Sequence, residues 1–255
     1  MLKAVLFDIN GTINEIWTNE TDDAVYRTVA NYLSYQGVLI PADVLKRDFF
    51  DINRHQRETS EELYPEFDAV GIFEKIVDRY ATSYTHHLPK HKRELLAQTA
   101  AEVFRAATRS HLSLYPDVEK TLTALQKKYR LGALSDGQEV WAIPELNAVG
   151  LSDFFEHVLV SSHYGYRKPD PRLFKKLLKK MHLDPNEAVY VGNDMYRDVY
   201  GAQGVGLKTV FFRSNQGEQT FPDAKPDYVI SRFSKLIDAM EWFEKKEKKH
   251  RHETP

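Results

Sequence analysis

Residues 4–12 read AVLFDINGT, a short apolar run that ends at an aspartate and continues into an Asn-Gly pair. A continuous apolar run bounded by turn residues is typical of a strand that is buried on both faces. Asn10 and Gly11 could instead form a β-hairpin turn, but no alternating partner strand follows them and the sequence turns helical by about Thr21. The pattern therefore predicts a buried strand with Asp8 at its carboxyl end.

Apolar runs and helical stretches alternate from about Leu114 onward. The predicted strands cover residues 4–7, 131–134, 158–160, 188–191, 208–212 and 228–230, with helices that begin at Pro116 and near Pro171. Strands that alternate with helices indicate a parallel sheet. The predicted fold class is therefore α/β, with a doubly wound parallel sheet of the Rossmann type as its core.

Residues 15–111 have a different pattern, in which apolar residues recur at helical spacing. Four helices are predicted here; the first ends at Gly37, a typical C-cap, and the third reaches Tyr84. An unstructured loop of this length is uncommon in a compact protein. We therefore predict that residues 1–14 and 112–255 form the α/β core and that residues 15–111 form an inserted helical cap.

The composition restricts the classes of partner. The chain has 35 Lys and Arg against 37 Asp and Glu, so it lacks the basic excess of a nucleic-acid-binding protein. Only residues 244–252 are dense in charge, and they are predicted to be a solvated helix end. There is no cysteine, which excludes disulfides and cysteine-ligated metals.

Neither a secretory signal nor a membrane span is predicted. The N-terminal stretch reaches Asp8 after only four apolar residues, fewer than a signal peptide needs. No window approaches the roughly 18 continuous apolar residues of a transmembrane helix. We therefore expect a cytoplasmic protein without a membrane partner, either a monomer or a homodimer.

Polar residues directly follow several of the predicted strands. Asp8, Ser135 and Asp194 all stand at such positions. Singly, residues of these types more often cap a helix or close a turn. In an open parallel sheet, however, ligands bind outside the carboxyl ends of the strands, so their joint placement predicts a ligand site.

These motifs resemble those of the haloacid dehalogenase superfamily, whose members are mostly phosphatases. The family pattern is a strand-terminal Asp-x-Asp-Gly-Thr, a strand-terminal Ser or Thr, a Lys, and a strand followed by an acidic pair. The corresponding stretches here are Asp8-Ile9-Asn10-Gly11-Thr12, Ser135-Asp136-Gly137, Lys168-Pro169, and Gly192-Asn193-Asp194 with Asp198 four residues later. Order and spacing agree over nearly the whole chain, and the helical insertion resembles the family's mobile cap.

The resemblance implies phosphoryl transfer from a small phosphorylated substrate. Asp8 is the expected nucleophile, and Lys168 is expected to neutralise phosphate charge. The expected cofactor is Mg²⁺, which prefers oxygen ligands and needs only one or two carboxylates. Its expected ligands are Asp8, the backbone carbonyl of Asn10, Asp194 and Asp198, and the expected phosphate-binding residues are Thr12, Ser135, Asp136, Gly137 and Lys168.

The chain departs from the family at Asn10, where the phosphatases carry a second aspartate. That aspartate protonates the leaving alcohol and then activates water, and an amide can do neither at neutral pH. General acid–base catalysis is worth roughly 10² to 10⁴ in rate, so we expect slow turnover or an accumulating covalent intermediate. Asn193 stands where the family usually has an acid, which leaves open whether Asp194 or Asp198 contacts the metal.

Four explanations of Asn10 are open at this point. It is an engineered replacement that traps a complex, or a natural residue in an enzyme for good leaving groups such as acyl phosphates. A dehalogenase also needs no acid, because halide leaves without a proton; such enzymes, however, work without magnesium and lack an acid at the position of Asp194. The fourth explanation is a non-catalytic protein that binds a metabolite or another protein.

Substrate choice in this family depends largely on the cap. The polar candidates there are His55, Arg57, His86, His87 and Arg109. No motif supports any of them, and a lone histidine or arginine on a helix is more often simply solvated.

Overall fold

A computed structural model describes the backbone of residues 1–253 and the side chains of residues 1–248. Its larger sheet has six parallel strands in the order β5-β4-β1-β6-β7-β8. They are β1 (Ala4–Phe7), β4 (Arg130–Ser135), β5 (His157–Val160), β6 (Ala188–Gly192), β7 (Lys208–Phe212) and β8 (Tyr228–Ile230). The predicted doubly wound parallel sheet is confirmed, and all six predicted strands are present.

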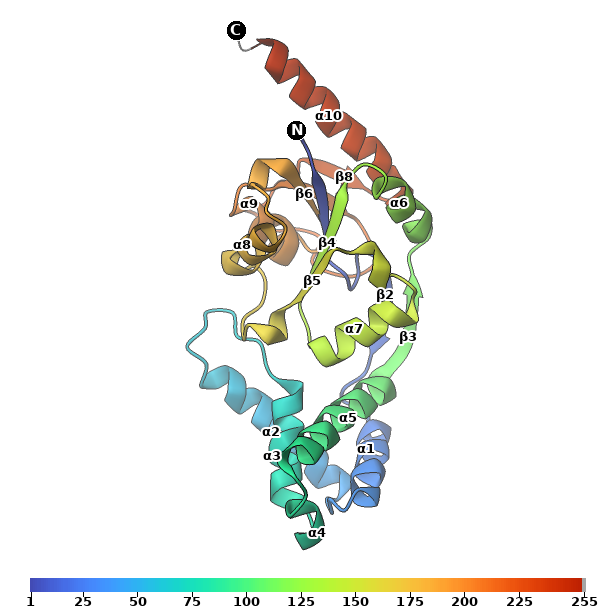
Figure 1. The fold of residues 1–255 in the computed structure, drawn as a ribbon, viewed down its shortest axis with the longest axis vertical. Helices are drawn as coiled ribbons and strands as arrows, with labels where there is room; N and C mark the ends of the chain where they lie inside the picture. Colours follow the sequence, from blue (N-terminus) through green and yellow to red (C-terminus); the bar gives the residue numbers. More distant parts are fainter. Residues whose placement is uncertain (254–255) are drawn as a thin grey trace.

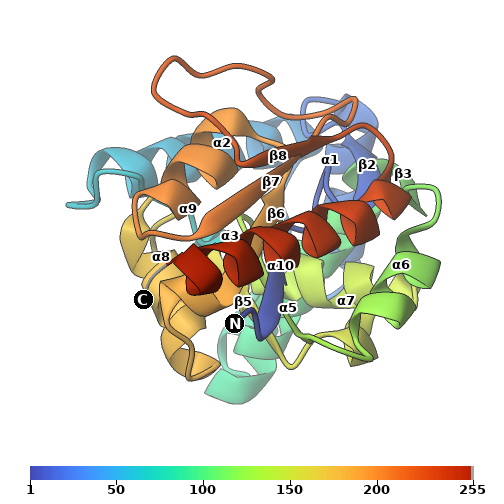
Figure 2. The same cartoon turned by 90° about the horizontal axis from the view of Figure 1, so that it is seen from above.

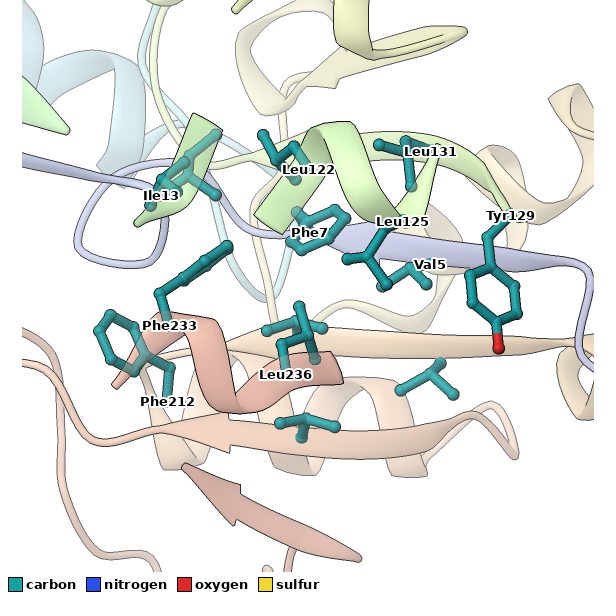
Figure 3. Packing of buried hydrophobic residues seen from close by; sticks show 14 of the residues in the cluster. Val5, Phe7, Ile13, Leu122, Leu125, Tyr129, Leu131, Phe212, Phe233 and Leu236 are labelled. Carbon is teal, nitrogen blue, oxygen red and sulfur yellow. The ribbon is translucent and has the colours of Figure 1, made fainter. Parts of the chain in front are cut away.

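The central strand β1 is buried on both faces, which explains its unbroken apolar run. Val5 and Phe7 point into a core layer formed with α6 (Val118–Leu125) and α10 (Leu236–Glu253). Figure 3 shows Phe7 among Leu122, Phe233 and Leu236 in this layer. Ala4 and Leu6 point to the opposite face, into a second layer.

Helices cover both faces of the sheet. The first layer also receives the end of α7 (Glu139–Ala148), and the second is closed by α8 (Pro171–Lys180) and α9 (Gly201–Gln203). Figure 2 shows α10 running across the strands with the N-terminus beside it. The charged stretch from residue 244 continues α10 as far as Glu253, and its side chains beyond residue 248 lie outside the described residues.

The remaining helices form a separate layer at the other end of the molecule (Figure 1). They are α1 (Asp23–Tyr35), α2 (Ala42–Glu58), α3 (Ala69–Tyr80), α4 (Ser83–His86) and α5 (Lys90–Thr108). Their own apolar cluster centres on Phe49, Phe73 and Phe104, with the rings of Phe49 and Phe104 stacked 4.4 Å apart. Trp141 of α7 joins this cluster, so α7 belongs to both layers.

The expectation of helices throughout residues 15–111 is wrong at both ends. β2 (Asn14–Thr18) and β3 (Arg109–Leu114) pair as an antiparallel ribbon that connects the helical layer to the core (Figure 1). Cross-strand contacts stabilise such a ribbon, and each strand's partner lies far away in the sequence. Local periodicity therefore carried no signal for it.

Two helix boundaries also differ from the prediction. The helix expected to start at Pro116 begins at Val118, because Asp117 takes a left-handed conformation with φ 66°. The third helix ends at Tyr80, and Tyr84 belongs to the short α4. Gly37 does follow the end of α1 with a positive φ, as a C-cap residue should.

Asn10 and Gly11 form a turn but not a hairpin. The Gly11 amide donates to the Asn14 carbonyl at 2.7 Å, and the strand that follows pairs with β3 rather than with β1. In the described part of the chain, no helix is long and apolar enough to span a bilayer.

Candidate active site

The motif residues meet at the carboxyl edge of the parallel sheet. Asp8 follows β1, which lies between β4 and β6, and Ser135 and Gly192 end those two neighbours. Asp8, Ser135, Lys168 and Asp198 are all more than nine-tenths buried. The sheet topology therefore gathers residues that are far apart in the sequence into one enclosed polar cluster.

Lys168 is the centre of this cluster. Its Nζ lies 2.7 Å from Asp8 Oδ1 and 2.6 Å from Asp198 Oδ1. Burial alone would lower the pKa of Lys168, but attraction to Asp198 and Asp8 outweighs burial and holds that pKa well above its usual value. Lys168 therefore remains a cation fixed between two carboxylates.

Thr12 connects the loop after β1 to the loop after β6. Its hydroxyl donates to Asp8 Oδ2 at 2.8 Å and also lies 3.0 Å from Asn193 Oδ1. Gly11 allows this approach: its φ is +86°, and a Cβ there would lie 2.4 Å from Asn193 Nδ2. Asp8 thus has a donor on each carboxylate oxygen.

Asp194 is fully occupied as a helix cap. Its Oδ1 accepts from the amides of Tyr196 and Arg197, while Oδ2 accepts from Arg197 Nε at 2.9 Å and from the Glu218 amide at 3.1 Å. Although burial opposes it, the Arg197 guanidinium holds the pKa of Asp194 below its usual value. None of these contacts is with Lys168; the basic partner of Asp194 is Arg197.

Asp198, one π-helical turn later, points toward Lys168 instead. The amides of Asn193 and Asp194 donate to its Oδ2 at 3.1 and 3.0 Å, which leaves Oδ1 to Lys168. Gly192 makes room for this carboxylate, because a Cβ there would lie 2.3 Å from Asp198 Cβ. Burial raises the pKa of Asp198 to about 6, against the attraction of Lys168.

The loop after β4 is braced by neighbours. Asp136 Oδ1 accepts the backbone N–H of Lys168 at 2.9 Å, and the Ser135 hydroxyl donates to the Asp136 carbonyl at 3.3 Å. The Gly137 amide donates to the Ser161 hydroxyl at 2.8 Å, and Ser161 donates in turn to Glu66. The Gly137 amide is therefore already used in this arrangement, and a phosphate would have to displace Ser161 to bind it.

Asn10, two residues after Asp8, has a buried side-chain oxygen, Oδ1, that lacks a hydrogen-bond partner among the described residues. Such atoms are uncommon in proteins and usually indicate a bound water, ion or ligand group. The amide can donate a hydrogen bond or accept one, but it has no titratable proton.

Tyr190 was not singled out from the sequence. Its hydroxyl lies 3.4 Å from Lys168 Nζ and 3.4 Å from Asp198 Oδ1, so Tyr190 belongs to the cluster. Burial raises its pKa well above the usual value, so it remains a neutral phenol. The available signal was strand alternation, because Tyr190 precedes Gly192 by two residues and therefore points to the same face.

The polar candidates of the helical layer lie in different places. His55, His86 and His87 are exposed, and Arg109 is half-buried at the start of β3. Only Arg57, in the last turn of α2, lines a hollow that Lys168 also lines.

The residues of the cluster suit a magnesium ion. Asp8 and Asp198 supply two carboxylates that converge on Lys168, and the side-chain Oδ1 of Asn10 is a further buried oxygen that has no hydrogen-bond partner among the described residues. Among the described residues, no group of three acidic, histidine or cysteine side chains converges to hold a metal. Magnesium needs only one or two carboxylates beside carbonyls and water, so this donor set fits it and would suit few softer metals.

Several known proteins are similar to this chain. A glyceraldehyde 3-phosphate phosphatase from Pyrococcus furiosus is 38% identical over 135 residues, which are 52% of this chain and 56% of that protein. A glyceraldehyde 3-phosphate phosphatase from Methanopyrus kandleri is 28% identical over 251 residues, or 94% of this chain and 97% of that one. The chain therefore spans little more than half of the first relative but nearly all of the second.

The fold comparison agrees with the sequence comparison. The crystal structure of a HAD phosphatase from Thermococcus onnurineus superposes with a TM-score of 0.60 at 25% identity, covering 94% of this chain and 98% of that one. Residues 5–212 match the family model described as haloacid dehalogenase-like hydrolase. This chain therefore belongs to the haloacid dehalogenase-like hydrolases, as the motif pattern predicted.

Proposed function

We propose that this protein is a magnesium-dependent phosphatase of small phosphorylated metabolites that works through an aspartyl-phosphate on Asp8. The observation that carries the proposal is the Asp8–Lys168–Asp198 cluster, in which the buried carboxylate of Asp8 is paired with a buried lysine. Relatives named as glyceraldehyde 3-phosphate phosphatases support the substrate class.

Asp8 is the nucleophile in this proposal. One carboxylate oxygen attacks phosphorus, the bond from phosphorus to the leaving oxygen breaks, and the phosphoryl group is transferred to Asp8. Lys168 and the Thr12 hydroxyl hold both carboxylate oxygens, which fixes the direction of attack. Lys168 also offsets the repulsion between the carboxylate and the phosphate.

Asp8, Asp198 and the backbone carbonyl of Asn10 would hold the magnesium ion. Bound there, the ion would neutralise charge on the phosphate. We assign the second carboxylate to Asp198 rather than to Asp194, because Asp198 shares Lys168 with Asp8, whereas Asp194 pairs with Arg197.

In this proposal, the absence of a carboxylate at Asn10 slows both steps of phosphate-ester hydrolysis. The leaving alkoxide must take its proton from water, and the second step, attack of water on the aspartyl-phosphate, lacks a carboxylate base. Asn10 can still orient that water through its amide. We therefore infer slow turnover of ordinary phosphate esters and better turnover of substrates with good leaving groups. The helical layer would act as the cap that excludes bulk water.

The substitution Asn10→Asp tests this function. Hydrolysis of an aryl phosphate in the presence of magnesium should rise by roughly 10² to 10⁴, the usual worth of a general acid–base group. Adding Asp8→Asn to the variant should return the rate to background, and chelation should do the same. Mass mapping of the Asn10-Gly11 peptide is the control against deamidation in the unmodified chain.

The alternatives give different outcomes in the same assay. Halide release that needs no metal would identify a dehalogenase. If Asn10→Asp remains at background over a broad panel of phosphate esters, the phosphatase proposal is wrong, and a binding role is the better reading.

A further inference from the structure

A segment of the helical layer docks against the loop that carries Lys168. We call residues 60–68, which connect α2 to α3, the strap. The Arg167 amide donates to the Tyr64 carbonyl at 2.9 Å, and the Glu66 amide donates to the Gly165 carbonyl at 3.0 Å. The strap, in cyan at the left of Figure 1, therefore forms one wall of the approach to Lys168.

Two hollows of similar size open beside the strap, and they differ in charge. One has a volume of about 540 Å³ and is lined by Arg57, Arg167, Lys168 and Arg197, with Asp194 and Glu218 as its acids. The other, of about 550 Å³, is lined by the acids Asp68, Glu102 and Glu139, with His163 as its single basic side chain. A phosphorylated metabolite is an anion, so it would enter the first hollow, which we call the basic hollow.

The cationic side chains that line the basic hollow differ in whether an acid of the protein already pairs with them. Lys168 is engaged by Asp8 and Asp198, and Arg197 by Asp194. The Arg57 side chain has no hydrogen bond or ion pair among the described residues, and its guanidinium lies over the Phe67 ring, with Cζ 5.2 Å from the ring centroid. A guanidinium can lie on an aromatic face and still present its fork of N–H donors to a carboxylate or a phosphate.

Arg167 is the second guanidinium of the hollow without a side-chain hydrogen bond in the described part of the chain. It forms one long ion pair, with Asp136, in which Nε lies 3.6 Å from Oδ2. Its backbone is held by the strap, and it directly precedes Lys168 in the sequence. A group bound to Arg167 would therefore lie beside a phosphate held at Lys168.

We propose that Arg57 and Arg167 bind a second anionic group of the substrate, a carboxylate or a second phosphate. This inference rests on the proposed phosphatase function and narrows its substrate class. Arginine binds such oxyanions through paired N–H donors, and one donor set here comes from the helical layer and the other from the core. The volume of the basic hollow lies within the usual range for small-ligand sites.

Binding measured by calorimetry tests the proposal without depending on turnover. The first probe pair is 3-phosphoglycerate against glycerol 3-phosphate, which differ in one carboxylate. The second pair is fructose 1,6-bisphosphate against fructose 6-phosphate, which differ in one phosphate. The unmodified chain with magnesium should bind the doubly anionic member of at least one pair roughly ten- to a hundredfold more tightly, as charge-assisted hydrogen bonds supply.

Two substitutions and a matched control complete the test. Arg57→Gln and Arg167→Gln should each remove most of this preference while leaving the singly charged probe unaffected. Arg54→Gln is the control, because Arg54 lies on the same helix, pairs with Asp51 and does not line the basic hollow. Unchanged melting temperatures would show that the variants remain folded.

The outcomes separate this proposal from the function on which it rests. Phosphate binding that is lost in Lys168→Met but shows no preference within either pair would overturn only the second-anion site. A preference that survives both arginine substitutions would also overturn it. If no probe binds the unmodified chain, the proposed function fails and the second-anion site fails with it.

Discussion

The loops after β1 and β6 each begin with an acid and an asparagine, but the hydrogen bonds of these residues differ between the two loops. After β1, the acid Asp8 contacts Lys168, and the Oδ1 of nearby Asn10 is buried with no hydrogen-bond partner in the described part of the chain. After β6, the acid Asp194 is saturated by donors, and the neighbouring Asn193 lies against Thr12. A polar side chain whose hydrogen bonds are all made within the protein holds its loop in place. A buried polar atom without a hydrogen-bond partner is available to a ligand.

Two acids on the same turn after β6 have different basic partners. Asp194 and Asp198 are four residues apart, yet only Asp198 contacts Lys168. The π-helical segment Met195–Tyr200 determines this difference, because Asp194 caps it and Asp198 lies within it. Residue type alone therefore does not identify the acid that belongs to the site.

Removal of Lys168 should have the largest effect on stability. Lys168→Met leaves Asp8 and Asp198 buried against each other, and loss of one partner of a buried pair costs about 3 to 5 kcal/mol. Urea unfolding at pH 7.5 in chelator measures this loss. Lys235→Met, which removes an exposed cation, is the control and should have little effect.

The pH dependence of the Lys168→Met variant sharpens this test. The folded-state pKa of Asp198 is already raised to about 6 in the unmodified chain, so protonation favours the folded state. The stability that depends on protonated Asp198 is fully present below its usual pKa of 3.8 and is lost as pH rises through the folded value. The penalty of the substitution should therefore shrink at acidic pH, and a penalty independent of pH would contradict this account.

Asp194→Asn should have an intermediate effect. The amide can still cap the turn, but Arg197 loses its charged partner, which we expect to cost about 2 kcal/mol near neutral pH. Because the folded pKa of Asp194 is lowered, its contribution is present above its usual pKa of 3.8 and is lost as pH falls through the folded value. Urea unfolding of both chains from pH 7 to pH 3 should show a difference that is constant near neutral pH and begins to shrink once the pH falls below 3.8.

The effect of magnesium on the melting temperature should distinguish Asp194 from Asp198. If Asp194 only caps the turn, Asp194→Asn should retain the rise in melting temperature that magnesium gives the unmodified chain. Asp198→Asn should lose that rise. The reverse result would assign the metal to Asp194 and invalidate our reading of the loop after β6.

Thr12→Val should reduce the free energy of unfolding less than Lys168→Met or Asp194→Asn does. It removes the hydroxyl that connects the two loops, and one net hydrogen bond is worth about 1 kcal/mol. Thr12→Ser keeps the hydroxyl and is the matched control. Equal destabilisation by both substitutions would mean that the methyl group, not the hydrogen bond, stabilises this contact.

The sequence was sufficient to predict the core sheet. The inner strands, such as β1 and β6, are short apolar runs because helices cover both faces of the sheet, and such runs are visible without any tertiary information. The ribbon of β2 and β3 was missed because its stability depends on pairing between distant segments, such as Ile16 with Leu112.

The candidate site was predicted in part. Position after a strand was enough to bring Asp8, Ser135 and the acids after β6 to one edge of the sheet. The directions of Asp194 and Asp198 could not be predicted, since they depend on how one turn winds and on the hydrogen bonds that saturate it. The contact between the strap and Arg167 is formed by backbone atoms and has no signature in the residue types.

The ribbon of β2 and β3 has a consequence for how such proteins can diversify. Thr18 and Arg109 are register partners, so the chain leaves the core and returns to it at the same place. Residues 19–108 could be shortened, lengthened or exchanged without altering a single pairing of the parallel sheet. A lineage can therefore exchange the helical layer while it keeps the strand pairing that positions Asp8, and a laboratory graft across this junction could do the same.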